Sequence, residues 1–308
     1  MRLKDKTAMI VGAGQTPGPT MGNGRATAIL FAREGARVLA VDRDLESARE
    51  TVEIIRSEGG SAEATEADVV DEASLKAAVV YCTGQLGRLD ILHNNVGISV
   101  TGGDAPVTEI SVEAFDRIMT VNLRGVVLTC KHALPLMRAQ GSGVIVTISS
   151  IAAIENYPWV TYKASKAALV TLTQQLAIQN AEYGIRANVI LPGLMDTPMA
   201  VDNRAKAWGQ TREEVVAARN AKVPLGEEDG RCVGRCQCRP VPGLGRGPIY
   251  YRCLSARRRR HDLQDRLSLT PLSRRQKQHA QNRQSGHTGG RQQHAATGTR
   301  HLGRKSRR

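Results

Sequence analysis

The amino-acid sequence predicts an α/β fold, a single domain built on a doubly wound parallel sheet with helices on both faces. Short aliphatic runs alternate with longer segments whose apolar residues recur at helical spacing, and the alternation continues to about residue 225. Parallel strands need crossover connections, which are usually helices, so this order favours a parallel sheet. Aromatic residues make up only 3% of the chain, and the predicted core is therefore aliphatic.

Strands and helices are predicted in alternation along the chain. The strand over residues 143–149 has the strongest pattern because Val, Ile, Val, Thr and Ile follow one another. Gly35 and the pair Gly59-Gly60 mark the ends of the first two helices. The predicted strands are residues 7–11, 37–41, 62–67, 90–93, 143–149 and 185–191, and the predicted helices are residues 24–34, 45–58, 72–83, 111–137 and 162–183.

The last part of the chain differs in composition from the rest. The formal net charge is +14, yet residues 1–225 hold 23 Lys and Arg against 24 Asp and Glu, whereas residues 226–308 hold 20 against 5. The last part also has no Phe and no helical or strand periodicity. We therefore predict a folded domain over residues 1–225 and a disordered basic tail over residues 226–308.

A glycine-rich segment lies between the first strand and the first helix. Gly12 and Gly14 follow the strand, and Gly22 and Gly24 open the helix. Glycines let the backbone approach a pyrophosphate, and the helix N-terminus supplies free N–H groups and the positive end of its dipole. The segment predicts a dinucleotide site; an ordinary tight turn is the alternative.

Asp42 stands at the end of the second predicted strand. In dinucleotide-binding folds a carboxylate at this place bonds the adenosine ribose hydroxyls and repels a 2′-phosphate. We therefore expect NAD as the cofactor. Arg25 and Arg43 are expected as nearby cations and keep NADP as an alternative, and a surface carboxylate is the other interpretation of Asp42.

Tyr162 and Lys166 are four residues apart on a predicted helix and so share one face. A tyrosine ordinarily titrates near pH 10, too high for a base at neutral pH. A lysine ammonium and a positively charged nicotinamide would stabilise the phenolate, which fits Tyr162 for proton transfer to a carbonyl or from an alcohol. An exposed pair on a helix surface is the alternative for these two residues considered alone.

From residue 7 to about residue 225 the sequence resembles the short-chain dehydrogenase/reductase family. Gly12, Gly22 and Gly24 match the phosphate-loop glycines of that family, although the loop over residues 15–21 is longer and contains two prolines. Asn94-Asn95-Val96-Gly97 is similar to its Asn-Asn-Ala-Gly segment. The resemblance implies a Rossmann-type fold and hydride transfer between NAD(P)(H) and an alcohol/ketone substrate, with 3-oxoacyl compounds among the candidates.

The same resemblance implies roles for further residues. Asp68 contacts the adenine, Asn95 lies against the cofactor, and Asn94 has a structural role. The segment over residues 192–197 lies beside the nicotinamide carboxamide, with Met195 and Thr197 as its cofactor contacts.

The resemblance also implies how the catalytic group is completed. A serine at the end of the strand over residues 143–149 orients the substrate oxygen; Ser150 is the match by motif, and Ser149 stays an alternative by spacing. Asn122 supports a water that links Lys166 to solvent. Neither His93 nor His132 has partners that indicate catalysis or metal binding, and no metal site is predicted.

Residues 226–308 offer three interpretations. Their cysteines suggest zinc, and the run over residues 257–260, four arginines, suggests nucleic acid. Reverse translation with the reading frame moved forward by one nucleotide explains more of the tail sequence than the zinc or the nucleic-acid interpretation does. Residues 227–247 then become compatible with an amphipathic helix, and residues 248–263 with the closing strand and turn of the family. We predict a one-nucleotide insertion near codon 226, so that the catalytic domain is incomplete at its C-terminal end. The cysteines concerned are Cys232, Cys236, Cys238 and Cys253.

These observations leave three hypotheses. The first is an oxidoreductase acting on a small alcohol or ketone; the others are an inactive product or cofactor-binding scaffold from a disrupted gene, and a nucleic-acid binder acting through its basic tail. Family members usually form homodimers or homotetramers, and we expect this assembly to suffer here because the tail departs from the family. No apolar run suits a signal peptide or a membrane span, so a soluble cytoplasmic protein is expected.

Overall fold

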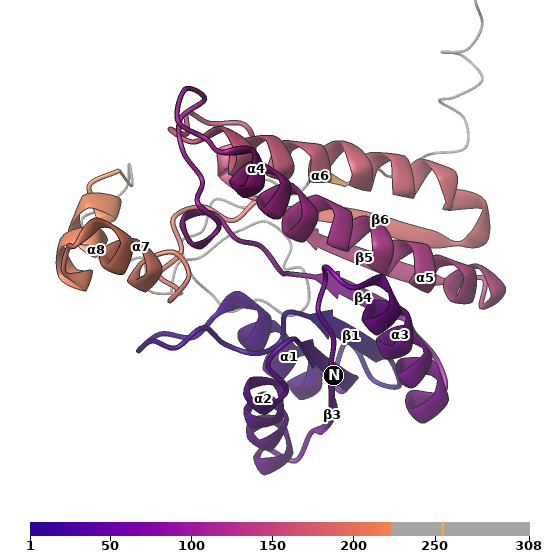
Figure 1. Cartoon of the computed structure of the whole chain (residues 1–308). Helices are drawn as coiled ribbons and strands as arrows, with labels where there is room; N and C mark the ends of the chain where they lie inside the picture. Colours follow the sequence, from indigo (N-terminus) through magenta and orange to yellow (C-terminus); the bar gives the residue numbers. More distant parts are fainter. Residues whose placement is uncertain (223–253, 256–308) are drawn as a thin grey trace, which may run out of the picture. The chain divides into compact units, whose positions relative to one another are not determined.

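The computed structural model describes residues 1–222 and 254–255. A seven-stranded sheet has the order β3-β2-β1-β4-β5-β6-β7 (Figure 1). Strands β1 to β6 are parallel, and β7 pairs antiparallel with β6. The strands are β1 (Thr7–Val11), β2 (Arg37–Asp42), β3 (Ser61–Glu66), β4 (Ile91–Asn94), β5 (Gly143–Ile148), β6 (Ile185–Ile190) and β7 (Leu254–Ser255).

The helices follow the strands in the predicted alternation, and the predicted doubly wound fold is confirmed. Four of the described α-helices begin at side-chain caps, with Asp44, Asp71, Ser111 and Thr211 each accepting a hydrogen bond from a backbone N–H in the first turn. The helices are α1 (Asn23–Arg33), α2 (Leu45–Ser57), α3 (Glu72–Leu86), α4 (Val112–Met119), α5 (Gly125–Ala139), α6 (Val160–Gln179), α7 (Asp202–Trp208) and α8 (Arg212–Asn220).

The core consists of two large aliphatic clusters, one on each face of the sheet. One cluster joins α1 and α2 to the sheet, and it contains Phe31 and Val52. The other joins α3, α5 and α6 to the opposite face through residues such as Val79, Cys130 and Leu169. A third, small cluster is made by Val146, Ile148 and Ile190 of β5 and β6, and none of the described helices contributes to it.

The structure differs from the sequence-based expectations in three places. The predicted helix over residues 111–137 is divided by a π-helical turn, η2 (Thr120–Arg124), between α4 and α5. Helices α7 and α8 were not predicted; they are short, and they lie to one side of the sheet (orange in Figure 1). Strand β7 falls in a segment expected to have no regular structure. The domain boundary at residue 225 and the frameshift concern residues outside the described part of the chain and stay predictions.

Candidate active site

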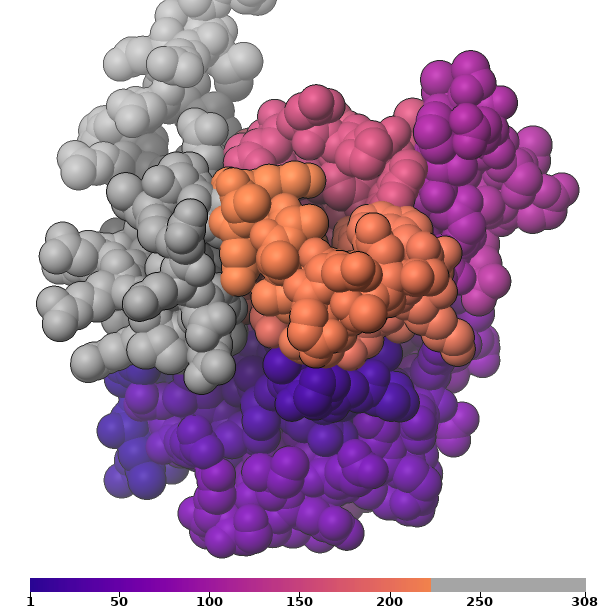
Figure 2. Space-filling view, turned by 90° about the vertical axis from the view of Figure 1, so that its left-hand side faces the viewer, coloured from indigo at the N-terminus to yellow at the C-terminus, as the bar shows by residue number. Residues whose placement is uncertain are grey.

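A cleft of about 1310 Å³ lies at the carboxyl ends of the parallel strands. Residues that follow β1, β2, β4, β5 and β6 line it, as expected for an open parallel sheet, where ligands bind outside the carboxyl ends near the switch in strand order. Figure 2 shows α7 and α8 (orange) between the N-terminal part of the chain (indigo) and the region of α6 (pink). Residues of both helices belong to the cleft lining.

The glycine-rich segment forms a close backbone crossing. A Cβ on Gly24 would lie 1.8 Å from the carbonyl oxygen of Gly12, and Gly12 itself has φ +86°. Only glycine fits at either place, so α1 begins directly against the end of β1. Gly22 precedes α1 without any side-chain cap, and nothing lies within 4 Å of its Cβ position. The free N–H groups of the first turn of α1 therefore open onto space that fits a pyrophosphate.

The longer loop of residues 15–21 reaches the region of α7 and α8. A Cβ on Gly18 would lie 2.8 Å from the ring of Pro198. The hydroxyl of Thr20 accepts a hydrogen bond from Arg212 at 3.4 Å, and Arg212 is also paired with Asp196. The loop thus connects the glycine-rich segment to α7 and α8, the two helices that cover the cleft.

Asp42 lies at the end of β2 and lines the cleft. Its carboxylate accepts hydrogen bonds from the backbone N–H groups of Gly14 at 2.9 Å and of Asp44 at 3.2 Å. Arg25 points elsewhere: its guanidinium is buried against α2, where it donates to Thr51 at 2.9 Å and pairs with Glu50 at 2.7 Å. Of these two arginines, it is the exposed Arg43 that lines the cleft.

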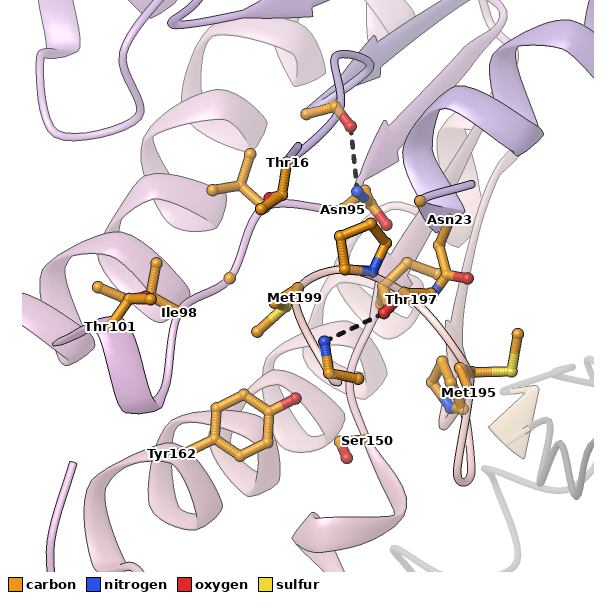
Figure 3. A pocket seen from close by; sticks show the side chains of 18 of the residues that line it. Thr16, Asn23, Asn95, Ile98, Thr101, Ser150, Tyr162, Met195, Thr197 and Met199 are labelled. Atoms are coloured by element: carbon orange, nitrogen blue, oxygen red, sulfur yellow. Dashed lines mark hydrogen bonds between the residues drawn. The ribbon is translucent and has the colours of Figure 1, made fainter. Parts of the chain in front are cut away.

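Asp68 follows β3, and Asn94 and Asn95 lie at the end of β4. Asp68 lines the cleft, and its carboxylate accepts a hydrogen bond from the N–H of Val70 at 3.1 Å. The amide of Asn95 donates to the carbonyl of Gly12 at 3.1 Å, shown as a dashed line in Figure 3. Asn94 is buried, with its amide 3.8 Å from the sulfur of Cys130, which agrees with the structural role expected for it.

Tyr162, Ser150 and Lys166 meet at the end of β5. Tyr162 and Ser150 project into the same part of the cleft (Figure 3). The ammonium of Lys166 donates to the carbonyl of Ile148 at 2.9 Å and lies 5.6 Å from the centre of the Tyr162 ring. Ser149 is buried instead, with its hydroxyl bonded to the carbonyl of Lys166 at 2.6 Å. The structure thus brings Ser150, not the hydroxyl of Ser149, to the tyrosine.

Burial dominates the titration of this pair. It raises the pKa of Tyr162 to about 12, against the smaller lowering by the hydrogen bond with Ser150. It also lowers the pKa of Lys166 to about 8. The expected lowering of the Tyr162 pKa by Lys166 is not found in the protein chain by itself, where Ser150, Arg204 and Arg219 are the groups that lower it.

Asn122 lies in the π-helical turn and is fully buried. Its side-chain amide accepts from the N–H of Ile98 at 2.7 Å and donates to the carbonyl of Ile98 at 2.9 Å and to Ser165 at 3.0 Å. A Cβ on Gly97 would lie 3.0 Å from the ammonium of Lys166 and 3.5 Å from the amide oxygen of Asn122. Asn122 thus ties α6 to the loop after β4, close to Lys166.

The segment after β6 closes the cleft on its other side. Met195 and Thr197 line the cleft and are almost fully buried. The hydroxyl of Thr197 accepts a hydrogen bond from the N–H of Ala200 at 3.3 Å (Figure 3). Every residue predicted to contact a cofactor therefore lies on this one cleft.

Several residues of the site were not predicted from the sequence. The carboxylate of Asp104 accepts hydrogen bonds from the backbone N–H groups of Thr161 and Tyr162, both at 3.1 Å, and so holds the first turn of α6. Three large aromatic residues and two arginines line the substrate side of the cleft: Tyr157, Trp159, Trp208, Arg204 and Arg219. The gathering of aromatic residues near position 160, in a chain so poor in them, was the available signal.

Two further observations concern the described residues alone. In that part of the chain no three His, Cys, Asp or Glu side chains gather as a metal ion would need. Within the same residues no helix has the length and apolar character to cross a membrane. The tail cysteines considered for zinc lie outside the described residues.

The sheet, the glycine-rich segment and the tyrosine–lysine pair define an oxidoreductase that binds a nicotinamide cofactor. A family model described as short chain dehydrogenase matches residues 6–208. The chain is 40% identical to YxbG, an uncharacterized oxidoreductase of Bacillus subtilis, over 73% of this chain and 80% of that protein. The chain belongs to the short-chain dehydrogenase/reductase family, as its resemblance indicated.

Solved structures agree with this assignment. A short-chain dehydrogenase/reductase from Burkholderia xenovorans is 38% identical, with a TM-score of 0.66, over 75% of this chain and 87% of that chain. An NAD+-bound xylitol dehydrogenase is 29% identical, with a TM-score of 0.65, over 73% of this chain and 86% of that chain.

Proposed function

We propose that the protein interconverts a small alcohol and its ketone, with Tyr162 as the acid and base. The observation that carries this proposal is the meeting of Tyr162, Ser150 and Lys166 in the cleft that also receives the glycine-rich segment. Bound nicotinamide would accept the hydride of an alcohol or donate one to a ketone, and its oxidised ring would add positive charge beside the tyrosine. Side chains of the protein would bind the cofactor, orient the substrate and transfer the proton.

The residues of the cleft suit the binding of a nicotinamide cofactor. The uncapped start of α1 and the open space at Gly22 suit the two phosphates, and Asp68 and Asn95 line the same cleft, where Asp68 would contact the adenine and Asn95 would lie against the cofactor. Met195 and Thr197 would hold the carboxamide side of the nicotinamide.

Each reacting residue has one task in this proposal. The hydroxyl of Ser150 donates a hydrogen bond to the substrate oxygen, and the hydroxyl of Tyr162 gives that oxygen a proton or takes one from it. The ammonium of Lys166 binds the nicotinamide ribose and favours the phenolate by its charge. Asn122 supports the path by which Lys166 exchanges protons with solvent.

We further propose NAD(H) rather than NADP(H) as the cofactor. The carboxylate of Asp42 faces the cleft and would repel a 2′-phosphate. Arg25 is engaged with α2, which leaves Arg43 as the nearby cation available to such a phosphate. The identity of the substrate, including the 3-oxoacyl class, stays a prediction.

The test compares Tyr162→Phe with the unchanged chain of 308 residues. We expect the substitution to abolish NADH-dependent ketone reduction while the enhancement of NADH fluorescence on binding stays nearly the same, because only the hydroxyl carries the proton. Tyr81→Phe is the matched control, since Tyr81 is an exposed tyrosine bonded to Glu63. Reduction by Tyr162→Phe at an undiminished rate would refute the proposed role. Absence of NADH binding by the unchanged chain would favour the inactive-product hypothesis.

A further inference from the structure

A row of aromatic side chains runs along the substrate side of the cleft, starting at Tyr162. The ring centres of Tyr157 and Tyr162 are 5.4 Å apart, those of Tyr157 and Trp159 are 5.4 Å apart, and those of Trp159 and Trp208 are 5.8 Å apart. Such a row offers an apolar path for the body of a substrate whose reacting carbon lies at Tyr162.

Two arginines stand beside this row, one from each helix of the cover. Arg204 on α7 donates to the hydroxyl of Tyr157 at 3.2 Å and lies 5.7 Å from the centre of the Trp159 ring. Arg219 on α8 donates to the carbonyl of Met195 at 3.0 Å. Both line the cleft, and the charge of each lowers the pKa of Tyr162, whose hydroxyl is proposed to react.

Neither guanidinium has a carboxylate partner within the described residues. The ion pairs of that part of the chain include neither Arg204 nor Arg219, because the nearby Asp196 and Asp202 are paired with Arg212. A guanidinium has five donor N–H groups, and the described hydrogen bonds of Arg219 use one of its nitrogens. Glu155 also lines the cleft, as an exposed residue.

The two positive charges act on each other. Burial and, to a smaller extent, the charge of Arg204 lower the pKa of Arg219 to about 10, although the carboxylate of Asp196 acts in the opposite direction. Arg204 and Arg219 are half-buried and lack a directly paired carboxylate among the described residues, and the electrostatic cost of bringing the two positive charges together falls when an anion enters. The hydrogen bonds to Ala200, Tyr157 and Met195 hold both guanidinium groups in place before that happens.

We propose that Arg204 and Arg219 bind an oxyanion group of the substrate, so that the substrate is an acidic alcohol or ketone. The binding of an anion does not depend on the proposed function. The statement that this anion is the reacting substrate rests on the proposed function, since the same cleft must then carry out hydride transfer. A carboxylate suits the site best because a guanidinium can hold both of its oxygens. The short body of the substrate would lie along Tyr157 and Trp159, with its oxygen at Ser150 and Tyr162.

The two tryptophans allow anion binding to be measured without turnover. The chain contains two tryptophans, Trp159 and Trp208, and both line the cleft near Arg204. The unchanged chain is titrated with levulinate, a keto acid, and with methyl levulinate, its neutral ester, at constant ionic strength. We expect saturable quenching of tryptophan fluorescence by levulinate and at least tenfold weaker binding of the ester.

Arg204→Gln and Arg219→Gln remove one charge each. We expect at least tenfold weaker binding of levulinate in either variant, the loss typical of a charge-assisted hydrogen bond, and no change for the ester. Arg204→Lys should recover part of the affinity because it keeps the charge. Arg49→Gln is the control, because Arg49 is an exposed residue of α2. Circular dichroism and NADH binding confirm that each variant is folded.

The outcomes separate this inference from the proposed function. Equal binding of acid and ester, or equal loss of both in the glutamine variants, would overturn the anion site and leave the arginines as supports of α7 and α8. Ketone reduction with no preference for the acid would keep the proposed function and overturn this inference. Selective binding of levulinate without hydride transfer for any ketone would keep the anion site and overturn the proposed function.

Discussion

Replacement of Lys166 by methionine should make the folded chain more stable at neutral pH while it removes activity. Lys166 is 2% exposed, and its ammonium has a single hydrogen bond, to the carbonyl of Ile148, among the described residues. Burial lowers its pKa from 10.5 to about 8. Burying this charge therefore lowers the free energy of unfolding of the protein. Methionine has a similar shape without the charge, so the replacement should remove this loss of stability.

The magnitude follows from the two pKa values. Below pH 8 the lysine is protonated in both the folded and the unfolded chain, and the cost is complete, about 3 kcal/mol. Between pH 8 and 10.5 the unfolded chain binds the proton and the folded chain does not, so stability rises with pH. From about pH 7 to about pH 9.5 the stability of the unchanged chain relative to Lys166→Met should rise by about 2 kcal/mol.

Urea unfolding at a series of pH values measures this difference. Tyr162, with its raised pKa, titrates above this range, and the comparison at each pH removes contributions common to both proteins. Lys76→Met is the control, because Lys76 is an exposed residue of α3 and its substitution should give a difference independent of pH. Parallel stability curves for the unchanged chain and Lys166→Met would refute the reasoning.

Three further predictions concern other parts of the molecule. Asp104→Ala removes the acceptor of two N–H groups at the start of α6, so it should cost about 1–2 kcal/mol and lower the melting temperature by roughly 2–8 °C, with a smaller loss for Asp104→Asn; an unchanged melt would contradict this. Asp42→Ala should raise the ratio of kcat/KM with NADP(H) to that with NAD(H) by about tenfold or more, and a constant ratio would exclude Asp42 as the selector. Restoring the reading frame at codon 226 should raise the melting temperature and promote oligomers on sizing columns, because a covering helix and a closing strand bury apolar area worth about 25 cal/mol per Å2; equal melts and equal sizes would count against the frameshift.

The sequence predicted those features that depend on neighbouring residues. The run over residues 143–149 contains β5, and the run over residues 185–191 contains β6, because β-branched residues and bounding turns are local signals. The glycine crossing and the positions of Tyr162 and Lys166 on α6 also follow from short spacings. The fold and most of the candidate site could therefore be predicted without coordinates.

The remainder depends on contacts between distant residues. The π-helical turn holds Asn122 against Ile98 and Ser165. The spacing of apolar residues in 111–137 is that of a continuous helix and does not predict this turn. Asp104 caps α6 from 57 residues away, so the usual signal of a cap just before the helix is absent. Arg204 and Arg219 come together only because α7 and α8 fold over the cleft.

The crossing of Gly24 and Gly12 has a consequence for the gene as well as for the protein. Any codon change that replaces Gly24 places a carbon 1.8 Å from a carbonyl oxygen, a contact that no rotamer can relieve. Gly84, within α3, has nothing within 4 Å of its Cβ position. In a library of every single substitution, selected for soluble expression, codon 24 should therefore retain only its synonymous variants, whereas codon 84 should tolerate alanine, serine and larger residues.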